Sequence, residues 1–379
     1  MEQFSQPDFL QSLDPGSRKR EFLGWHRPLV ELAVEFVDRD FSPGMQDTLV
    51  IVPTRQAGRR LRAALGARSG GDNAPRIATP EFLYSPREES EPRPANGAET
   101  LFAWSLALQQ TSLTKLRNLF PIAPPERGSS WALSTANDLL NLRTTLGEAA
   151  LLMRDVPDRM AELSADGARW RELARIEREA TKTLAQAGLA DMAELRKALA
   201  NAPQLPSEIS RIALVGLPDP PGIAIRALEN LATTHDITVA VFAPSSEANY
   251  FDAWGRPIEE HWAQAQIDIA DDAIHICSDP RSQAETIAGL LKAGSPPALS
   301  IADTDLLPPL QSTFRHRSIE THLPAGSPVA SHELFALLQL IADLVETRAF
   351  GPAAEFARHP DLLDAAATHF VATDGAGEF

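Results

Sequence analysis

The stretch from Leu49 to Leu65, LVIVPTRQAGRRLRAAL, most constrains what this chain can fold into. Its first four residues are aliphatic without interruption, which is typical of a strand buried on both faces of a parallel sheet. Pro53 ends the strand because it has no N–H group to donate to a strand ladder. Thr54 is then the predicted N-cap of a helix, because threonine is a favoured capping residue. The helix residues predicted to face inward are Ala57, Leu61, Ala64 and Leu65.

The outer face of this predicted helix carries arginines. Arg55, Arg59 and Arg62 lie at i, i+4 and i+7 and share one face, with Arg60 beside the row. A threonine at the mouth of a parallel strand and the N–H groups of a helix N-terminus suit an anion, and the arginines extend the positive field. The pattern indicates a contact with a phosphate backbone, although charged outer faces are also typical of helices that only face solvent.

Composition narrows the class of protein. The 379 residues, 44% hydrophobic and 23% charged, suffice for two or three domains with a sizeable core. A single cysteine, Cys277, excludes an internal disulfide and a CxxC metal site. The net charge of −16 argues against a protein that coats nucleic acid through a general basic surplus. Any contact with nucleic acid must therefore be local.

The sequence carries no signal for export or for membrane insertion. Its first twenty residues are polar, we expect them to be loose, and they lack the basic-then-apolar order of a signal peptide. No apolar run approaches the roughly 18 residues of a membrane span. We therefore expect a cytoplasmic protein that does not associate with membranes.

Hydrophobic periodicity predicts strands and helices on either side of a long helical block. A helix is expected to begin near Pro28, and a short strand to end at Thr79. Residues 98 to 202 show helical spacing throughout, and their tryptophans are expected in the core. Strands are expected again at three places, with helices between them, which implies a parallel sheet. These strands are Ile212–Leu217, Ile237–Ala243 and Ile274–Ser278.

The last part of the chain is predicted to be mainly helical. SDPRSQAETIAGLLKAG indicates a loop and a helix, and SHELFALLQLIADLVETRAF and FARHPDLLDAA indicate two more helices. The inward residues of the first of these helices are expected to be Ala284, Ile287, Ala288 and Leu291. Before them, residues 251–262, FDAWGRPIEEHW, are expected to form a loop anchored by its aromatic side chains.

VPTR after a hydrophobic strand, followed by RRLR, resembles the motif Ia region of superfamily 1 helicases. More closely, it resembles the N-terminal helicase-like half of the AddB-type proteins of bacterial double-strand break repair, which are related in architecture to RecC. FDAWGRPIEEHW, HLPAGSPVASHELFALLQLIADLV and the RHPD after it also look like AddB-type sequence, and the likeness covers nearly the whole chain. In that family the VPTR motif lines a path for single-stranded DNA. The resemblance implies this role for Thr54 and Arg55 directly, and extends it to Arg59 and Arg62.

The resemblance also implies an architecture. It predicts an α/β protein with a parallel-sheet, P-loop-helicase-like domain formed by residues 1–97 and 203–262. A large all-helical insertion would occupy residues 98–202, and a partial second α/β, helicase-like domain would occupy residues 263–379.

The sequence lacks the residues that such proteins use for catalysis. A P-loop needs a lysine after a glycine, and none of the five lysines follows one; residues 24–27, GWHR, stand before the first helix instead. The acidic pair that would hold Mg²⁺ is replaced by LVGLPDPPG. The family's PD-(D/E)XK nuclease needs an acidic residue two positions before a lysine, and no lysine has one. We therefore predict an inactivated ATPase with no catalytic, cofactor-binding or metal-binding residue, in a chain that stops before the nuclease domain or is truncated.

These observations predict a non-catalytic, helicase-like DNA-binding scaffold of a double-strand break repair and recombination nuclease. It would hold single-stranded or unwound DNA beside an AddA-like helicase-nuclease partner, through Thr54, Arg55, Arg59 and Arg62. One alternative is an interaction subunit that docks the partner through residues 98–202 and never touches DNA. Another is an unrelated α/β enzyme acting on a phosphorylated metabolite near Thr54, for which the sequence shows no convergent acid-base groups.

Overall fold

Five parallel strands form the central sheet, in the order β1-β7-β6-β2-β3. Their bounds are β1 Arg18–Phe22, β2 Thr48–Ile51, β3 Arg76–Ala78, β6 Arg211–Val215 and β7 Asp236–Val241. The predicted strand at Leu49 lies inside the sheet, where Ile51 is paired with Leu214 of β6 and Ala78 of β3. Leu49, Val50 and Ile51 are fully buried because both faces of the sheet are covered. The protein is therefore an α/β protein with a parallel sheet, as the sequence predicted.

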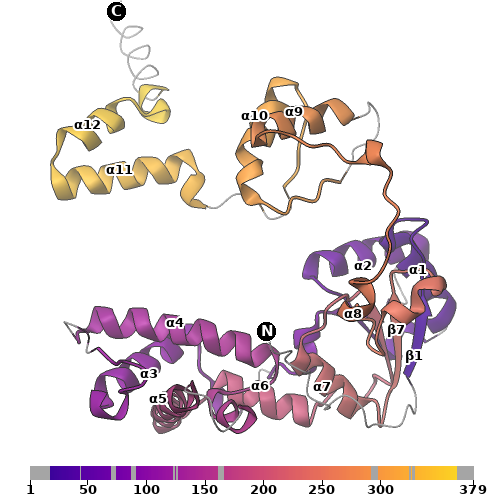
Figure 1. Cartoon of the computed structure of the whole chain (residues 1–379), viewed down its shortest axis with the longest axis horizontal. Coiled ribbons are helices and arrows are strands. Elements are labelled where there is room, and N and C mark those ends of the chain that lie inside the picture. The colour runs from indigo at the N-terminus through magenta and orange to yellow at the C-terminus, as the bar shows by residue number, and fades with distance from the viewer. Residues whose placement is uncertain are drawn as a thin grey trace, which may run out of the picture. The chain divides into compact units, whose positions relative to one another are not determined.

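The sheet belongs to the first of two units, Met1–Gln266 and Ile267–Phe379, into which this computed structural model divides. Figure 1 shows the elements of both units. The structure describes residues 18–42, 44–69, 74–86, 91–122, 124, 127–160, 166–291, 298–323, 326 and 329–364. The predicted loose start lies outside these ranges up to residue 17. The helicase-like domain assignment, with its boundaries at residues 97, 202 and 262, stays a prediction.

Helices cover the two faces of the sheet. On one face, α1 (Leu29–Phe41) and α2 (Arg55–Ser69) pack buried side chains, among them Val37 and Leu65, against Val50 of β2. On the other face, α7 (Gly222–Leu231) packs against the sheet, and α6 (Met192–Asn201) packs against α7. The predicted inward residues of α2 are confirmed, since Leu61 and Leu65 are buried and Ala57 and Ala64 pack against the same cluster.

The strand β1 corrects the prediction that the first twenty residues are loose. Arg18, Lys19 and Arg20 belong to a strand that pairs with β7 in parallel register. This strand lies at the border of the sheet, and its Lys19 and Arg20 side chains are exposed while its backbone pairs with β7. A charged border strand lacks the apolar run that identifies an interior strand, and the sequence pattern missed it for that reason.

The helical block forms a second core within the first unit. Helices α3 (Gly97–Gln110), α4 (Ser129–Glu148) and α5 (Asp166–Gln186) surround a fully buried Trp104, and Figure 1 shows them grouped together. Trp131 and Trp170 are half-buried and pack against the same cluster, which confirms that these tryptophans belong to the core. Two strands of two residues each, β4 (Arg93–Pro94) and β5 (Leu189–Ala190), pair beside the helices and were not predicted.

A buried ion cluster ties three parts of this block together. Arg143 of α4 donates from Nε to Glu177 of α5 at 2.9 Å and from Nη1 to Asp191 at 2.8 Å. All three side chains are almost completely buried. Burial opposes the charge of the guanidinium, but the two carboxylates outweigh it, so the pKa of Arg143 lies above its ordinary value. Asp191 also caps α6 by accepting from the backbone N–H groups of Ala193 and Glu194.

The loop that follows β7 is anchored by aromatic side chains, as predicted. Trp254 is 3% exposed and lies in the core beneath the sheet. An antiparallel bridge joins Phe251 to Pro257, and the Arg20 guanidinium donates to the carbonyl of Phe251 at 2.7 Å. The short helix α8 (Glu259–Trp262) closes the segment.

In the second unit, the regular elements of the described residues are all helical. Helix α9 (Pro280–Leu290) packs against α10 (Leu307–His316), and the inward residues predicted for α9 are confirmed. Helices α11 (Glu333–Thr347) and α12 (Phe350–Ala357) pack against each other. The strand predicted at Ile274–Ser278 is wrong, because these residues are irregular and Ile276 is 96% exposed. No strand lies beside them among the described residues, and strand propensity alone does not form a strand.

Candidate nucleic-acid interface

All strand pairings in the sheet are parallel, so the carboxyl ends of its strands share one edge. From β2 the chain passes through α2 to β3 on one side, whereas from β6 it passes through α7 to β7 on the other. The connections therefore diverge between β2 and β6. In open α/β sheets, ligands bind in the crevice at such a switch point. Thr54 follows β2 at this position, and Gly216 follows β6.

Thr54 is the N-cap that the sequence predicted. Its side-chain oxygen accepts a hydrogen bond from the backbone N–H of Ala57 at 3.0 Å, and the residue is exposed. One turn on, a Cβ atom at Gly58 would lie 3.3 Å from the side chain of Ile77, which is tighter than nine in ten such contacts. Glycine at this position therefore lets the first turn of α2 lie close against the sheet, and this fixes the helix N-terminus at the strand mouth.

The structure brings Arg55 and Arg59 to the exposed first turns of α2, next to Thr54. Neither guanidinium, nor that of Arg60, has an ion pair or a hydrogen bond in the part of the chain that the structure describes. Arg62 lies about 10 Å further along the helix than Arg55 and is also exposed. It differs from the others because it donates to the carbonyl of Ile77 in β3 at 3.4 Å.

Other arginines of the same face are neutralised. Arg68, at the far end of α2, pairs with Asp38 at 2.9 Å. Arg27, just before α1, donates two hydrogen bonds to Glu35, and this contact lowers the pKa of the Glu35 carboxyl. Among the described residues, the arginines of α2 without an ion pair therefore run from Arg55, next to the strand end, to Arg62.

The loop between β1 and α1 comes directly before the first helix, where the sequence carries GWHR and no P-loop lysine. It holds Gly24, with a φ of +83°, then Trp25, His26 and Arg27. Trp25 is 53% exposed, and its indole Nε1–H donates to the carbonyl of Phe242 at 2.6 Å. This tryptophan was not among the site residues predicted from the sequence. The available sequence signal was its place in a short loop between Gly24 and Pro28, where a large aromatic side chain can remain exposed.

The turn after β6 lies where the acidic pair of an active helicase was expected. Gly216 has a φ of +56°, and a Cβ atom there would lie 2.6 Å from the side chain of Leu29. Glycine is therefore needed for the turn and for the close approach of the start of α1. Asp219 is exposed in the proline-rich segment that follows.

Among the described residues, no three His, Cys, Asp or Glu side chains are grouped so that they could hold a metal ion. Within the same ranges, no helix has the length and apolar character needed to cross a membrane.

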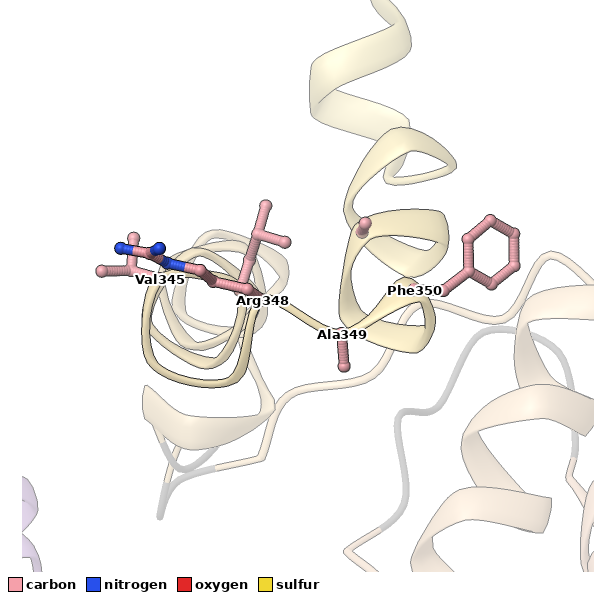
Figure 2. A pocket seen from close by; sticks show the side chains of 6 residues that line it. Val345, Arg348, Ala349 and Phe350 are labelled. Carbon is pink, nitrogen blue, oxygen red and sulfur yellow. The ribbon is translucent and has the colours of Figure 1, made fainter.

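A hollow of about 610 Å³ in the second unit lies at the bend between α11 and α12. Five of its six lining residues are apolar, and the sixth is Arg348. Figure 2 shows the Arg348 side chain and the Phe350 ring pointing in opposite directions. The hollow therefore lacks the convergent polar groups that orient a small substrate.

Fold and site together define an α/β protein with a parallel sheet and an arginine-bearing helix at its switch point. No family model matches the chain, and no curated protein matches its sequence.

Proposed function

We propose that this chain is a non-catalytic, helicase-like DNA-binding scaffold of the AddB/RecC kind in double-strand break repair. It would hold single-stranded or unwound DNA beside an AddA-like helicase-nuclease partner. The observation that carries the proposal is the pair Arg55 and Arg59, both exposed and without a counter-charge in the described residues, beside Thr54 at the strand mouth. The likeness of VPTR and RRLR to a DNA-lining motif supports the same residues.

Electrostatics explain why such a contact would be local. The chain has a net charge of −16, so most of its surface repels a polyanion. A strand of nucleic acid is attracted where arginines lack carboxylate partners, and the N–H groups at the start of α2 add a partial positive charge. Contacts of this kind go to phosphates, so they do not depend on base sequence and weaken as salt rises.

The test is a salt titration of single-stranded DNA binding by an Arg55→Gln/Arg59→Gln variant. Loss of two phosphate contacts should weaken affinity and reduce the slope of log K against log salt by about 1.4, at roughly 0.7 per contact. The matched control is Arg171→Gln/Arg178→Gln, which removes two exposed arginines from α5 and changes the net charge equally. The control should leave the slope unchanged.

Two results would contradict the proposal. One is an unchanged affinity and slope in the Arg55/Arg59 variant. The other is an equal loss in both double variants, because this would show a general effect of net charge in place of a local site.

A second candidate function is an interaction subunit that docks a helicase-nuclease partner without DNA contact. Exposed apolar side chains on the helical block favour it, since Phe102 of α3 is 65% exposed and Leu133 of α4 is 43% exposed. Isolated exposed apolar residues are common, so the pair is a modest signal. Co-purification with the partner, together with no shift of DNA mobility at low salt, would favour this function over the first.

A further inference from the structure

Trp25 is a large aromatic side chain held in one orientation while half of it faces solvent. Its Nε1–H bond to the carbonyl of Phe242, at 2.6 Å, fixes the indole from the β7 side. Two backbone bonds hold the preceding residues, from Leu23 N to Val241 O and from Gly24 N to Ala243 O. The ring remains 53% exposed. A fixed aromatic face in solvent is suited to stacking, because little conformational freedom is lost when a planar group covers it.

The ring lies at the same edge of the sheet as the arginine site. Trp25 follows β1 and Thr54 follows β2, and both strands end at the carboxyl edge. Two strands, β7 and β6, lie between them. Three steps of about 4.8 Å separate β1 from β2, so the ends of the two strands are roughly 14 Å apart along the edge. A strand of nucleic acid with phosphates at Thr54 reaches that far with a few nucleotides.

We propose that Trp25 is a nucleobase-stacking residue that binds a base of the single strand whose phosphates contact Thr54, Arg55 and Arg59. This inference rests on the proposed function. The arginine nearest in sequence, Arg27, is already neutralised because it is paired with Glu35, and Glu31 adds a further carboxylate in the first turn of α1. The contact at Trp25 is therefore apolar, and its contribution does not depend on salt. This property separates it from the arginine contacts.

A base can also come from a free nucleotide, because its ring presents the same planar face to the indole. The same stacking chemistry would serve either source. The experiment must therefore compare a strand with bases, a strand without bases and a free nucleotide.

The experiment measures binding of the full chain to labelled oligo(dT), to an abasic oligomer of equal length and to ATP. Trp25→Ala should weaken oligo(dT) binding about tenfold, while abasic binding and the salt slope stay unchanged. Trp25→Phe should retain most of the affinity because a phenyl ring still stacks. Phe102→Ala is the matched control, because it removes an exposed aromatic ring from α3, and it should bind as the wild type does.

Each other outcome overturns the inference in its own way. Equal loss on oligo(dT) and abasic strands would show a structural effect of the substitution. An unchanged oligo(dT) affinity would show that Trp25 does not stack, and weaker ATP binding in that case would assign the ring to a free nucleotide. If the wild type binds both strands equally, the inference fails while the proposed function stands. If it binds neither strand, both fail.

Discussion

The side-chain oxygen of Thr54 accepts the backbone N–H of Ala57 at 3.0 Å, so this hydroxyl is part of the helix before any ligand arrives. The cap uses a lone pair of the oxygen and leaves the hydroxyl hydrogen free to donate. One residue therefore serves the stability of α2 and presents a donor at the strand mouth. The two roles can be separated by substitution.

Thr54→Asp should keep the cap and lose the anion contact. Aspartate caps helices at least as well as threonine, so the free energy of unfolding should change by less than about 0.5 kcal/mol. Its carboxylate should repel phosphate and weaken single-strand binding. Thr54→Ala should instead lose about 1 kcal/mol of stability through loss of the cap. Urea unfolding and oligonucleotide binding measure the two effects, and undiminished binding by Thr54→Asp would exclude a phosphate at this position.

Arg143→Met should destabilise the first unit strongly. The substitution leaves the carboxylates of Glu177 and Asp191 buried without a counter-charge, which typically costs 3–5 kcal/mol, or about 4 kcal/mol here. Denaturant unfolding of the full chain measures the loss. Adding Glu177→Gln and Asp191→Asn should recover much of it, because both amides remain hydrogen-bonded and asparagine still caps α6. If Arg143→Met alone left the free energy of unfolding unchanged, water would have to stabilise the two carboxylates, and the cluster would not be dry.

Tyr84 should make stability fall in alkaline solution. Burial, helped by the charge of Glu81, raises the pKa of its hydroxyl to about 12, and the residue is 6% exposed. The unfolded chain loses this proton near pH 10 and the folded chain near pH 12. The free energy of unfolding therefore falls as the pH rises from about 10 to about 12, because only the unfolded chain is ionised at Tyr84 in that interval. The loss should reach about 2 to 3 kcal/mol. The free energy of unfolding of Tyr84→Phe should not show this fall over the same pH interval. Identical pH profiles of unfolding for the wild type and the variant would refute the prediction.

The sequence predicted the interior of the sheet well, because burial on both faces leaves an uninterrupted apolar run. Leu49 to Val52 and Ile212 to Val215 followed this rule, and Ile237 to Val241 did so apart from Thr238, which is partly exposed. The inward residues of α2 and α9 followed from helical spacing. The predictions were wrong for two other segments. Strand β1 was missed because it is charged, and Ile274–Ser278 was predicted as a strand because it is apolar, although no strand lies beside it among the described residues. In both cases the outcome depends on the neighbouring strand, which local pattern does not contain.

The candidate site was predicted in part. Thr54 and the arginine row were visible because strand, cap and helix are contiguous in sequence. The fixed orientation of Trp25 was not visible, because it depends on the carbonyl of Phe242, which follows β7 more than two hundred residues away. The Arg143 cluster was missed for the same reason, since it joins residues up to 48 positions apart on helices whose polar residues all resemble surface residues.

The charged strand β1 has a consequence for the behaviour of the molecule at high concentration. Arg18, Lys19, Arg20 and Glu21 stand in a row on the lateral border of the sheet, and β3 at the opposite border has only three residues. Neither border is a good template for a strand from another molecule, because one is charged and the other is short. Growth of the sheet from molecule to molecule, the usual first step of β-aggregation, is therefore disfavoured on both sides.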